Sequence, residues 1–406
     1  MAPAGDPGFA RAPHLPGQRP GIASTRSKRG RQGDEQMRTL KNARARAASG
    51  TTYGKAAARL PRRTLAAISA LAVALGIGLA GCGSGHAGGD KTGDSISFML
   101  DWTPNTNHVG IYVAQELGYY KQAGVSVRIL PTAQAGAETS VENGVADVGF
   151  SKLSNLAAFN TKGSHLRQVF DIGQEPIARW CALASRTDIR TPRDFDGKTF
   201  VSFGSAEQTA VVRQMIRNAG GNGDFKRATS GTSTFATLSS GKGDFAGFYV
   251  TWEGVQSDLK GPKLNCFVQS DWGVPGNPDQ TGFVVKDGWL RGQDHRTALR
   301  KFVQASKRGY DWALAHPDQA ADILVRQTPT AHIDPAQAHT SMERIVKEGY
   351  WTKQPGGTKL TGKVDMGDAQ TYLDFQQAAG SYQDAKGAKP DRAPQAKDLW
   401  TDEFVR

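Results

Sequence analysis

One short sequence pattern occurs at two places in the chain, and this repeat limits the folds that the chain can adopt. Residues 144–150, GVADVGF, recur as residues 241–247, GKGDFAG. Each copy follows a short helical pattern and leads into an apolar strand. The glycines at 144 and 241 are therefore expected to end a helix, and the aspartates at 147 and 244 to open the next turn. The repeat predicts two similar lobes.

Strand and helix patterns alternate around each copy of the repeat. In the first half we expect strands at 96–100, 125–130 and 147–151, and helices at 110–123 and 138–143. In the second half we expect strands at 198–203 and 244–250 on either side of a helix at 206–218. After a turn-rich stretch at 273–281 come a strand at 282–286 and helices at 296–315, 318–327 and 335–347. Such alternation is typical of an α/β fold in which each lobe has a mostly parallel sheet with helices on both faces.

The order of these elements indicates a chain that leaves the first lobe and later returns to it. We expect lobe 1 to comprise residues 96–186 and 281–406, and lobe 2 residues 187–280. Two crossings between lobes make a hinge, and a hinge beside a cleft is the architecture of closure on a ligand.

The segment before the folded part has the features of an export signal. Arg62 and Arg63 precede an uncharged stretch at 64–80, which is short for a bilayer span of about 20 residues. Leu79-Ala-Gly-Cys82 matches the lipobox of bacterial lipoproteins. We therefore expect residues 1–81 to be an N-terminal extension and signal peptide, and Cys82 to be lipidated. This places the protein outside the cell, anchored to the outer face of the bacterial cell membrane, with residues 82–95 as a flexible tether.

Several points about this leader stay open. An ordinary secretory peptide is the alternative to a lipoprotein signal. The paired arginines leave open whether the general secretory or the twin-arginine route is used. Translation could start at Met1 or at Met37.

The charge of the chain is concentrated in the leader. The whole chain carries a formal net charge of +12, but residues 1–81 hold 14 Lys and Arg against three Asp and Glu. The remaining chain is nearly neutral, with 36 basic and 35 acidic residues. The folded part thus lacks the basic excess of a nucleic-acid binder, and no nucleic-acid partner is expected.

Cysteine and histidine usage gives little indication of a metal or redox centre. Cys181 and Cys266 are the two cysteines beyond Cys82, and either a disulfide or buried thiols would fit an exported protein. The eight histidines and three cysteines show no metal-ligand spacing, and no GxxxxGKS phosphate loop is present. We therefore expect neither a metal nor a cofactor.

A polar and aromatic cluster follows the first expected strand. It contains Asp101, Trp102, Asn105, Asn107 and His108, between a strand end and a helix start. In open α/β sheets ligands bind at this place. A Trp beside Asn and Asp suits a flat heteroaromatic ring, one face of which stacks while its edge is hydrogen-bonded. Packing of Trp102 and helix capping by Asn107 and His108 are the alternatives.

A second cluster follows the equivalent strand of lobe 2 and contains Tyr249, Trp252 and Glu253. A carboxylate in a closing cleft can accept a hydrogen bond from an exocyclic amine, although Glu253 could instead complement a helix dipole. Ser151 and Asn155 follow the strand of the first repeat and are further candidates for ligand contact.

Three segments carry a resemblance to a known family: residues 98–124, 251–254 and 399–405. They resemble the pyrimidine-precursor binding proteins of thiamin salvage, which belong to the type II periplasmic binding proteins. The resemblance implies a monomeric substrate-binding component of an ABC importer, with a permease and an ATPase as partners. It also implies an aminopyrimidine ligand such as formylaminopyrimidine or hydroxymethylpyrimidine.

Two other functions are alternatives to binding of a pyrimidine. A eukaryotic relative of this family is an enzyme that makes the thiamin pyrimidine from its own histidine and pyridoxal phosphate. Alignment with it puts Ser151 where the cofactor lysine belongs and Asn155 where the histidine belongs, and Lys152 is expected to point away from the cleft. We therefore expect no enzyme. A binder of sulfonate, taurine, nitrate or riboflavin is the other alternative, and Asp101 and Glu253 argue against anionic ligands.

Overall fold

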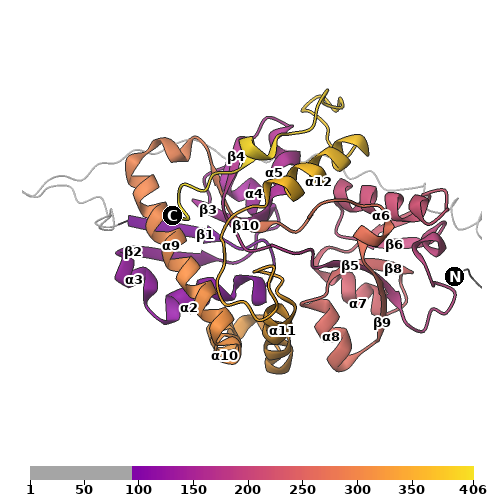
Figure 1. Ribbon diagram of the computed structural model, residues 1–406, viewed down its shortest axis with the longest axis horizontal. Helices are drawn as coiled ribbons and strands as arrows, with labels where there is room; N and C mark the ends of the chain where they lie inside the picture. The colour runs from indigo at the N-terminus through magenta and orange to yellow at the C-terminus, as the bar shows by residue number, and fades with distance from the viewer. Residues whose placement is uncertain (1–93) are drawn as a thin grey trace, which may run out of the picture. The chain divides into compact units, whose positions relative to one another are not determined.

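Two five-stranded sheets form the framework of the computed structural model, which describes residues 94–406 (Figure 1). These residues belong to one compact unit, 83–406. The expected signal peptide, the lipidation site Cys82 and nearly all of the expected tether lie outside the described residues. Strand β1 already begins at Asp94, so the fold starts slightly before the expected position at Ile96.

The first sheet has the strand order β2-β1-β3-β10-β4. Its strands are β1 (Asp94–Met99), β2 (Val125–Leu130), β3 (Val148–Lys152), β4 (Leu166–Asp171) and β10 (Thr281–Lys286). β1 runs parallel to β2 and β3, whereas β10 runs antiparallel to β3 and β4.

The second sheet has the equivalent order β7-β6-β8-β5-β9. Its strands are β5 (Ala178–Leu183), β6 (Thr199–Ser202), β7 (Lys226–Thr229), β8 (Phe245–Tyr249) and β9 (Leu264–Phe267). Here β5 is the reversed strand, antiparallel to β8 and β9. β5 and β10 are the strands that the chain enters directly after crossing from the other sheet. The two-lobed α/β fold is confirmed, and each sheet is mixed.

The sequence repeat occupies equivalent places in the two sheets. Gly144 and Gly241 adopt left-handed φ angles of 71° and 72° just after helices α4 (Gly136–Glu142) and α7 (Thr234–Ser239). The Asp147 carboxylate accepts a hydrogen bond from the Ser97 amide of β1 at 2.8 Å, and Asp244 accepts one from the Thr199 amide of β6 at 2.7 Å. Each aspartate thus joins its turn to the neighbouring strand, which explains why the pattern repeats.

Helices cover both sheets. Those of the first lobe are α2 (Val109–Glu116), α3 (Tyr119–Ala123), α4, α5 (Leu153–Asn160), α9 (Gln293–Ala315), α10 (Pro317–Gln327) and α11 (Pro335–Glu348). Those of the second are α6 (Ala206–Asn218), α7 and α8 (Glu253–Lys260). The single helix expected at 110–123 is two helices, because Gly118 takes a left-handed φ of 70° between α2 and α3. The largest core cluster lies where α2, α9 and α10 pack on the first sheet.

Two crossings connect the sheets, between β4 and β5 and between β9 and β10. The first crossing lies between Asp171 and Ala178. The expected boundary between lobe 1 and lobe 2 at 186/187 is therefore too late, because β5 already pairs within the second sheet.

The two crossings also contact each other. The Asn277 side-chain amide donates to the Gly173 carbonyl at 2.9 Å, and a Cβ on Gly173 would overlap the carbonyl oxygen of Asp279.

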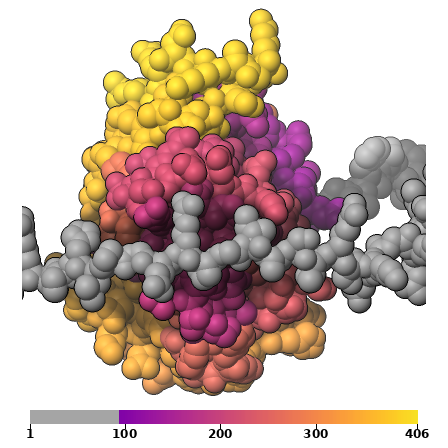
Figure 2. Space-filling view, turned by 90° about the vertical axis from the view of Figure 1, so that its right-hand side faces the viewer, coloured from indigo at the N-terminus to yellow at the C-terminus, as the bar shows by residue number. Residues whose placement is uncertain are grey.

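The C-terminal segment packs on both lobes. Helix α12 (Met366–Ala378) contacts α5 and α13 (Ala396–Leu399), while its Tyr372 joins the core cluster of the second lobe. Gly276 of the second crossing has a φ of 74°, and a Cβ there would lie 2.5 Å from the Asp368 carbonyl of α12. Figure 2 looks toward the second lobe, with the yellow C-terminal residues above it.

A disulfide joins Cys181 of β5 to Cys266 of β9, which face each other in the strand register. Of the two possibilities left open by the sequence, the structure shows the disulfide and not two free thiols. In the part of the chain from 94 onward, no helix combines the length and apolar character needed to cross a bilayer.

Candidate functional site

A cavity of about 250 Å³ lies between the two sheets, at the strand ends where a ligand site was expected. Both lobes and the crossing between β9 and β10 contribute to its walls. The residues that matter most to its chemistry are Asp101, Trp102, Asn105, Asn107, Glu138, Lys152, Asn155, Trp180, Phe203, Glu207, Gln208, Tyr249, Trp252, Glu253, Gln269, Asp279 and Tyr372.

Aromatic side chains from the two lobes meet across the cavity. Trp102 follows β1, and Phe203 follows β6, the equivalent strand of the second sheet. Their rings pack edge to face with centroids 5.1 Å apart and an interplanar angle of 83°. Tyr249 and Trp252 line the same cavity at the end of β8. The aromatic wall of the cavity is therefore built by both lobes.

Asp101 is held in place by a histidine behind it. The His108 ring lies 2.8 Å from the Asp101 carboxylate through Nε2, and its Nδ1 accepts the Asn105 amide hydrogen at 3.3 Å. Because Nδ1 is an acceptor, the proton of a neutral ring sits on Nε2 and points at Asp101. His108 is fully buried and does not line the cavity. Its expected ligand contact is therefore wrong, and the side chain positions Asp101 instead.

Asn105 and Asn107 both line the cavity. The Asn105 side chain accepts from the Asn107 amide at 2.9 Å and caps the short helical turn Thr106–His108. Asn105 thus has a structural task in addition to its place at the cavity wall.

Glu138 is a cavity residue that the sequence did not indicate. Its Oε1 accepts hydrogen bonds from the Ser151 hydroxyl at 2.5 Å and from the Asn155 amide at 2.8 Å. Asn155 lines the cavity as expected, but Ser151 lies behind Glu138 and does not, so its expected ligand contact is wrong. Ser151 and Asn155 hold one carboxylate oxygen, and the other oxygen has no hydrogen bond to residues 94–406. Glu138 was overlooked because an acidic residue in a first helical turn ordinarily complements the helix dipole.

Glu253 lies at a position that is compatible with both of its expected roles. It begins α8, where its carboxylate accepts from the Tyr249 amide at 3.1 Å, and it also lines the cavity. Burial raises the pKa of Glu253 to about 6. No cation within the described part of the chain pairs with it.

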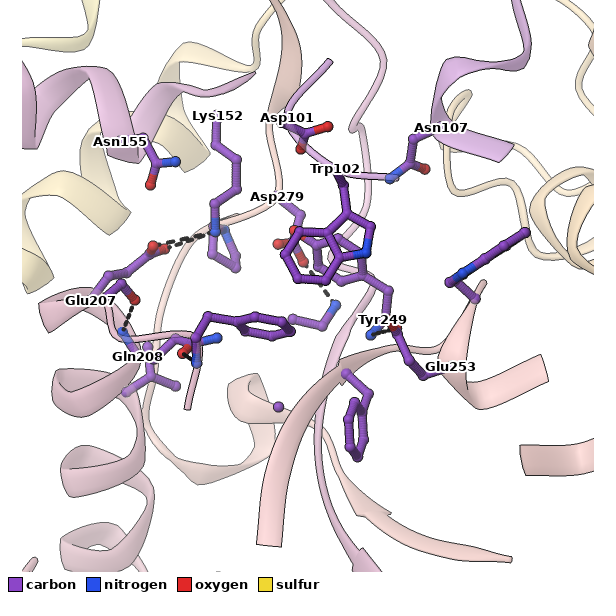
Figure 3. A pocket seen from close by; sticks show the side chains of 18 of the residues that line it. Asp101, Trp102, Asn107, Lys152, Asn155, Glu207, Gln208, Tyr249, Glu253 and Asp279 are labelled. Atoms are coloured by element: carbon purple, nitrogen blue, oxygen red, sulfur yellow. Dashed lines mark hydrogen bonds and ion pairs between the residues drawn. The ribbon is translucent and has the colours of Figure 1, made fainter. Parts of the chain in front are cut away.

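An ion pair joins the lobes across the cavity. Lys152 at the end of β3 lies 3.3 Å from Glu207 in the first turn of α6, and the two groups point toward each other in Figure 3. The hydroxyls of Ser154 and Tyr372 also donate to Glu207, at 3.2 and 2.8 Å. Lys152 was expected to point away from the cleft, and this is wrong: β3 continues through residue 152, which turns the side chain into the cavity.

The crossing between β9 and β10 supplies two more polar groups that the sequence does not single out, Gln269 and Asp279. Asp279 accepts from the Ile177 and Ala178 amides at 2.9 and 2.8 Å, and Gln269 accepts from the Trp180 indole at 3.2 Å. Asp279 lies in the turn-rich stretch, in which periodicity indicates only that the chain turns, and Gln269 begins a short 3-10 helix, Gln269–Trp272, just before it.

The site can be compared with known proteins. The family model described as "NMT1/THI5 like" matches residues 105–320, more than half of the chain and most of the cavity-lining segments. The chain belongs to this family. Across residues 94–406 there is no group of three or more His, Cys, Asp or Glu side chains that could hold a metal ion.

Relatives of this NMT1/THI5-like protein include binders and enzymes. The formylaminopyrimidine-binding protein of Halalkalibacterium halodurans is 26% identical over 259 residues, which cover 63% of this chain and 77% of that protein. The 4-amino-5-hydroxymethyl-2-methylpyrimidine phosphate synthase of Legionella pneumophila is 29% identical over 249 residues, covering 58% and 74%. The alkanesulfonate-binding protein SsuA of Xanthomonas axonopodis pv. citri, solved with MOPS, has the same fold, with a TM-score of 0.56 at 13% identity; the match covers 76% of this chain and 98% of SsuA.

Proposed function

We propose that this protein is the substrate-binding component of an ABC importer and captures an aminopyrimidine precursor of thiamin. One observation carries the proposal: the cavity combines an aromatic wall with an excess of carboxylates. Asp101, Glu138, Glu207, Glu253 and Asp279 line it, and Lys152 is the one cation among the described lining residues. Glu207 already neutralises that lysine.

Such a cavity selects ligands that donate hydrogen bonds. In our proposal the pyrimidine ring stacks against Trp102, and its amine donates to carboxylates of the cavity wall, with Asp101, Glu138 and Glu253 as the candidates. Charge-assisted hydrogen bonds of this kind remain favourable in a site from which water is excluded, provided that each carboxylate finds a donor. Asn105, Asn155, Tyr249 and Trp252 complete the proposed wall.

The same charge argues against the anion binders that share this fold. A sulfonate or nitrate in this cavity would face several carboxylates and a lysine that is already paired, and like charges repel strongly where the dielectric is low. Riboflavin is uncharged and is the alternative that electrostatics does not oppose.

We propose hinge closure as the means of capture. The two crossings, 172–177 and 268–280, would act as the hinge between the lobe of the first sheet and the lobe of the second. The cavity walls come from both lobes. Closure would therefore assemble the site around the ligand.

We propose binding without catalysis, although synthases are among the relatives. A Schiff base with pyridoxal phosphate requires an unprotonated lysine. Burial alone would lower the pKa of Lys152, but the neighbouring Glu207, Tyr249 and Asp279 outweigh burial and raise it. Lys152 thus stays an ammonium group. After incubation with pyridoxal phosphate and borohydride, the peptide that carries Lys152 should be unmodified even where exposed lysines such as Lys260 and Lys359 are labelled. A reduced adduct on Lys152 would contradict the proposal.

The proposal includes export and lipid anchoring at Cys82. The lipobox and the basic, apolar and small-residue order of the leader support it. An anchored binder stays close to its permease, so a weak encounter between them suffices. Cells that express the full chain should incorporate labelled palmitate into it, and C82S should abolish the label. Label on the C82S chain would contradict anchoring at this residue.

Calorimetry on the chain from Gly83 onward tests the ligand. We expect heat on addition of formylaminopyrimidine or hydroxymethylpyrimidine, and none with taurine or nitrate. Binding of taurine or riboflavin, with no heat from either pyrimidine, would overturn the proposed ligand class.

A further inference from the structure

The cavity carries more negative than positive charge. Five carboxylates and a single lysine are among the described residues that line it. Lys152 lies 3.3 Å from Glu207, and the other carboxylate whose charge acts on it is that of Asp279. Three carboxylates are left without a cationic partner in the described part of the chain, those of Asp101, Glu138 and Glu253. Carboxylates held away from bulk water need compensation, because burying a charge without its opposite is costly.

Asp101 keeps its charge in spite of the histidine behind it. Nδ1 of His108 accepts the Asn105 amide hydrogen, and a ring nitrogen that accepts a hydrogen bond carries no proton. The imidazole is therefore neutral, and it orients the Asp101 carboxylate without cancelling its charge. The Asp101 side chain is 34% exposed, so a ligand in the cavity can reach it.

Glu138 is the most deeply buried of the three, at 8% exposed. The Ser151 hydroxyl and the Asn155 amide hold its Oε1, and both donors are neutral. Its Oε2 has no hydrogen-bond partner among residues 94–406 and, unlike Oδ1 of Asp279, is not enclosed away from solvent. The first turn of α4 supplies only a partial positive charge, about half an elementary charge. Glu138 thus presents a charged acceptor that a ligand in the cavity can reach.

We propose that the ligand carries a positive charge on its arm and that Glu138 binds this charge. The inference rests on the proposed function and narrows it to an aminopyrimidine with an ammonium group on the arm. The ammonium donates to Oε2 of Glu138, while the exocyclic amine of the ring donates to Asp101 or Glu253. A charged donor compensates a carboxylate that a neutral arm leaves uncompensated, and a charge-assisted hydrogen bond is about twice as strong as a neutral one.

Three pyrimidines with the same ring separate the charge of the arm from its shape. Aminomethylpyrimidine ends in an ammonium group at neutral pH, and hydroxymethylpyrimidine ends in a neutral hydroxyl of similar size. Formylaminopyrimidine has the same arm nitrogen as the aminomethyl compound, but acylation has removed its charge.

The experiment measures the binding of these compounds by calorimetry at neutral pH. We expect the wild type to bind aminomethylpyrimidine at least about tenfold more tightly than either neutral compound. E138Q keeps an oxygen for Ser151 and Asn155 but replaces the free oxygen with NH₂. It should lose most of this preference, because an ammonium cannot accept from the new NH₂ whereas a hydroxyl can. E142Q, on the same helix outside the cavity, is the matched control and should keep the preference.

The outcomes separate this inference from the proposed function. A wild type that binds a neutral pyrimidine as tightly as the aminomethyl compound would overturn the inference and leave the aminopyrimidine proposal standing. A folded E138Q chain that keeps the wild-type preference would also overturn it. Thermal unfolding shows whether E138Q is folded, and the wild-type comparison decides if it is not. A wild type that binds none of the three pyrimidines would overturn both proposals.

Discussion

At the scale of single residues, the carboxylates of the cavity differ in what holds them. Glu138 is held by two donors on one oxygen, Asp101 by one buried histidine, and Glu253 by backbone amides. A carboxylate held in one orientation loses less entropy when a ligand amine binds to it. The proposed hydrogen bonds should therefore contribute unequally to affinity.

Glu138 is expected to contribute most. E138Q keeps an oxygen for Ser151 and Asn155 but places an NH₂ group where the ligand amine would donate. The aminopyrimidine should then bind about 2 to 3 kcal/mol more weakly, because a charged hydrogen bond is replaced by a contact between two donors. S151A should cost about 1 kcal/mol, because Glu138 keeps its second anchor. Calorimetry measures both effects.

Glu142 lies on the same helix outside the cavity, so E142Q is the matched control and should bind the ligand normally. Equal losses of affinity in E138Q and E142Q would contradict the role of Glu138.

Glu253 makes stability and binding respond to pH in opposite directions. Its pKa of about 6 in the folded protein lies above the ordinary value of 4.5, so the folded chain holds this proton more tightly than the unfolded chain does. The contribution of Glu253 to stability is therefore fully present below about pH 4.5, is lost as pH rises to about 6, and is absent above. Ligand binding needs the carboxylate and should weaken as pH falls through the same range.

E253Q separates the two effects. Without ligand, the variant should be about 1 to 2 kcal/mol more stable than the wild type at neutral pH, and equally stable near pH 4. Urea unfolding at both pH values measures this difference. The same variant should bind the aminopyrimidine more weakly at neutral pH. An E253Q chain that is less stable at neutral pH would show that the carboxylate mainly supports the start of α8.

At the scale of elements, the sequence could predict what depends on local pattern. Strand and helix periodicity located β1, β2, β3, β6, β8, β10 and most helices, because these segments bury one face or both. The aromatic cluster after β1 could be found because Trp102 and Asp101 adjoin a strand end. Glu138, Gln269 and Asp279 could not be found this way, since their roles come from partners distant in sequence. The sequence could not show whether β3 ends at residue 151 or at residue 152. This difference of one residue determines whether the Lys152 side chain points into the cavity or away from it.

The second crossing is held against α12 by a backbone contact that only glycine permits. G276A should destabilise the protein by about 2 to 3 kcal/mol, because the new methyl group meets the Asp368 carbonyl in addition to the left-handed strain. Gly387 has a similar φ of 82° with open space around its Cβ position, so G387A carries the strain alone, about 1 kcal/mol. Thermal unfolding measures both. Equal losses would mean that the contact with α12 can relax.

At the scale of the whole folded unit, the lobes are joined by more than the two crossings. Ser341 of α11 donates to the Thr251 carbonyl of the second lobe at 2.5 Å, and Arg344 donates to the Val250 carbonyl at 2.8 Å. Lys152 and Glu207 join the opposite lobe surfaces inside the cavity. The structure therefore has the contacts of a closed form, and these contacts would have to break for a ligand to enter.

The ion pair is the contact whose loss should favour opening. E207Q keeps an oxygen for Ser154 and Tyr372 but removes the carboxylate that is paired with the largely buried Lys152 ammonium, so that Asp279 is the acidic neighbour that remains. An open form lets water solvate that ammonium, so the equilibrium should shift toward opening by about 1 to 3 kcal/mol. The radius of gyration of the ligand-free variant in solution scattering should then exceed that of the wild type.

D287N is the control. It breaks the ion pair between Asp287 and Arg167, 2.7 Å apart inside the first lobe, and should leave the radius of gyration unchanged. If E207Q and D287N scatter alike and like the wild type, the pair does not control closure, and the other contacts between the lobes, including those of the crossings, α11 and α12, must hold them together.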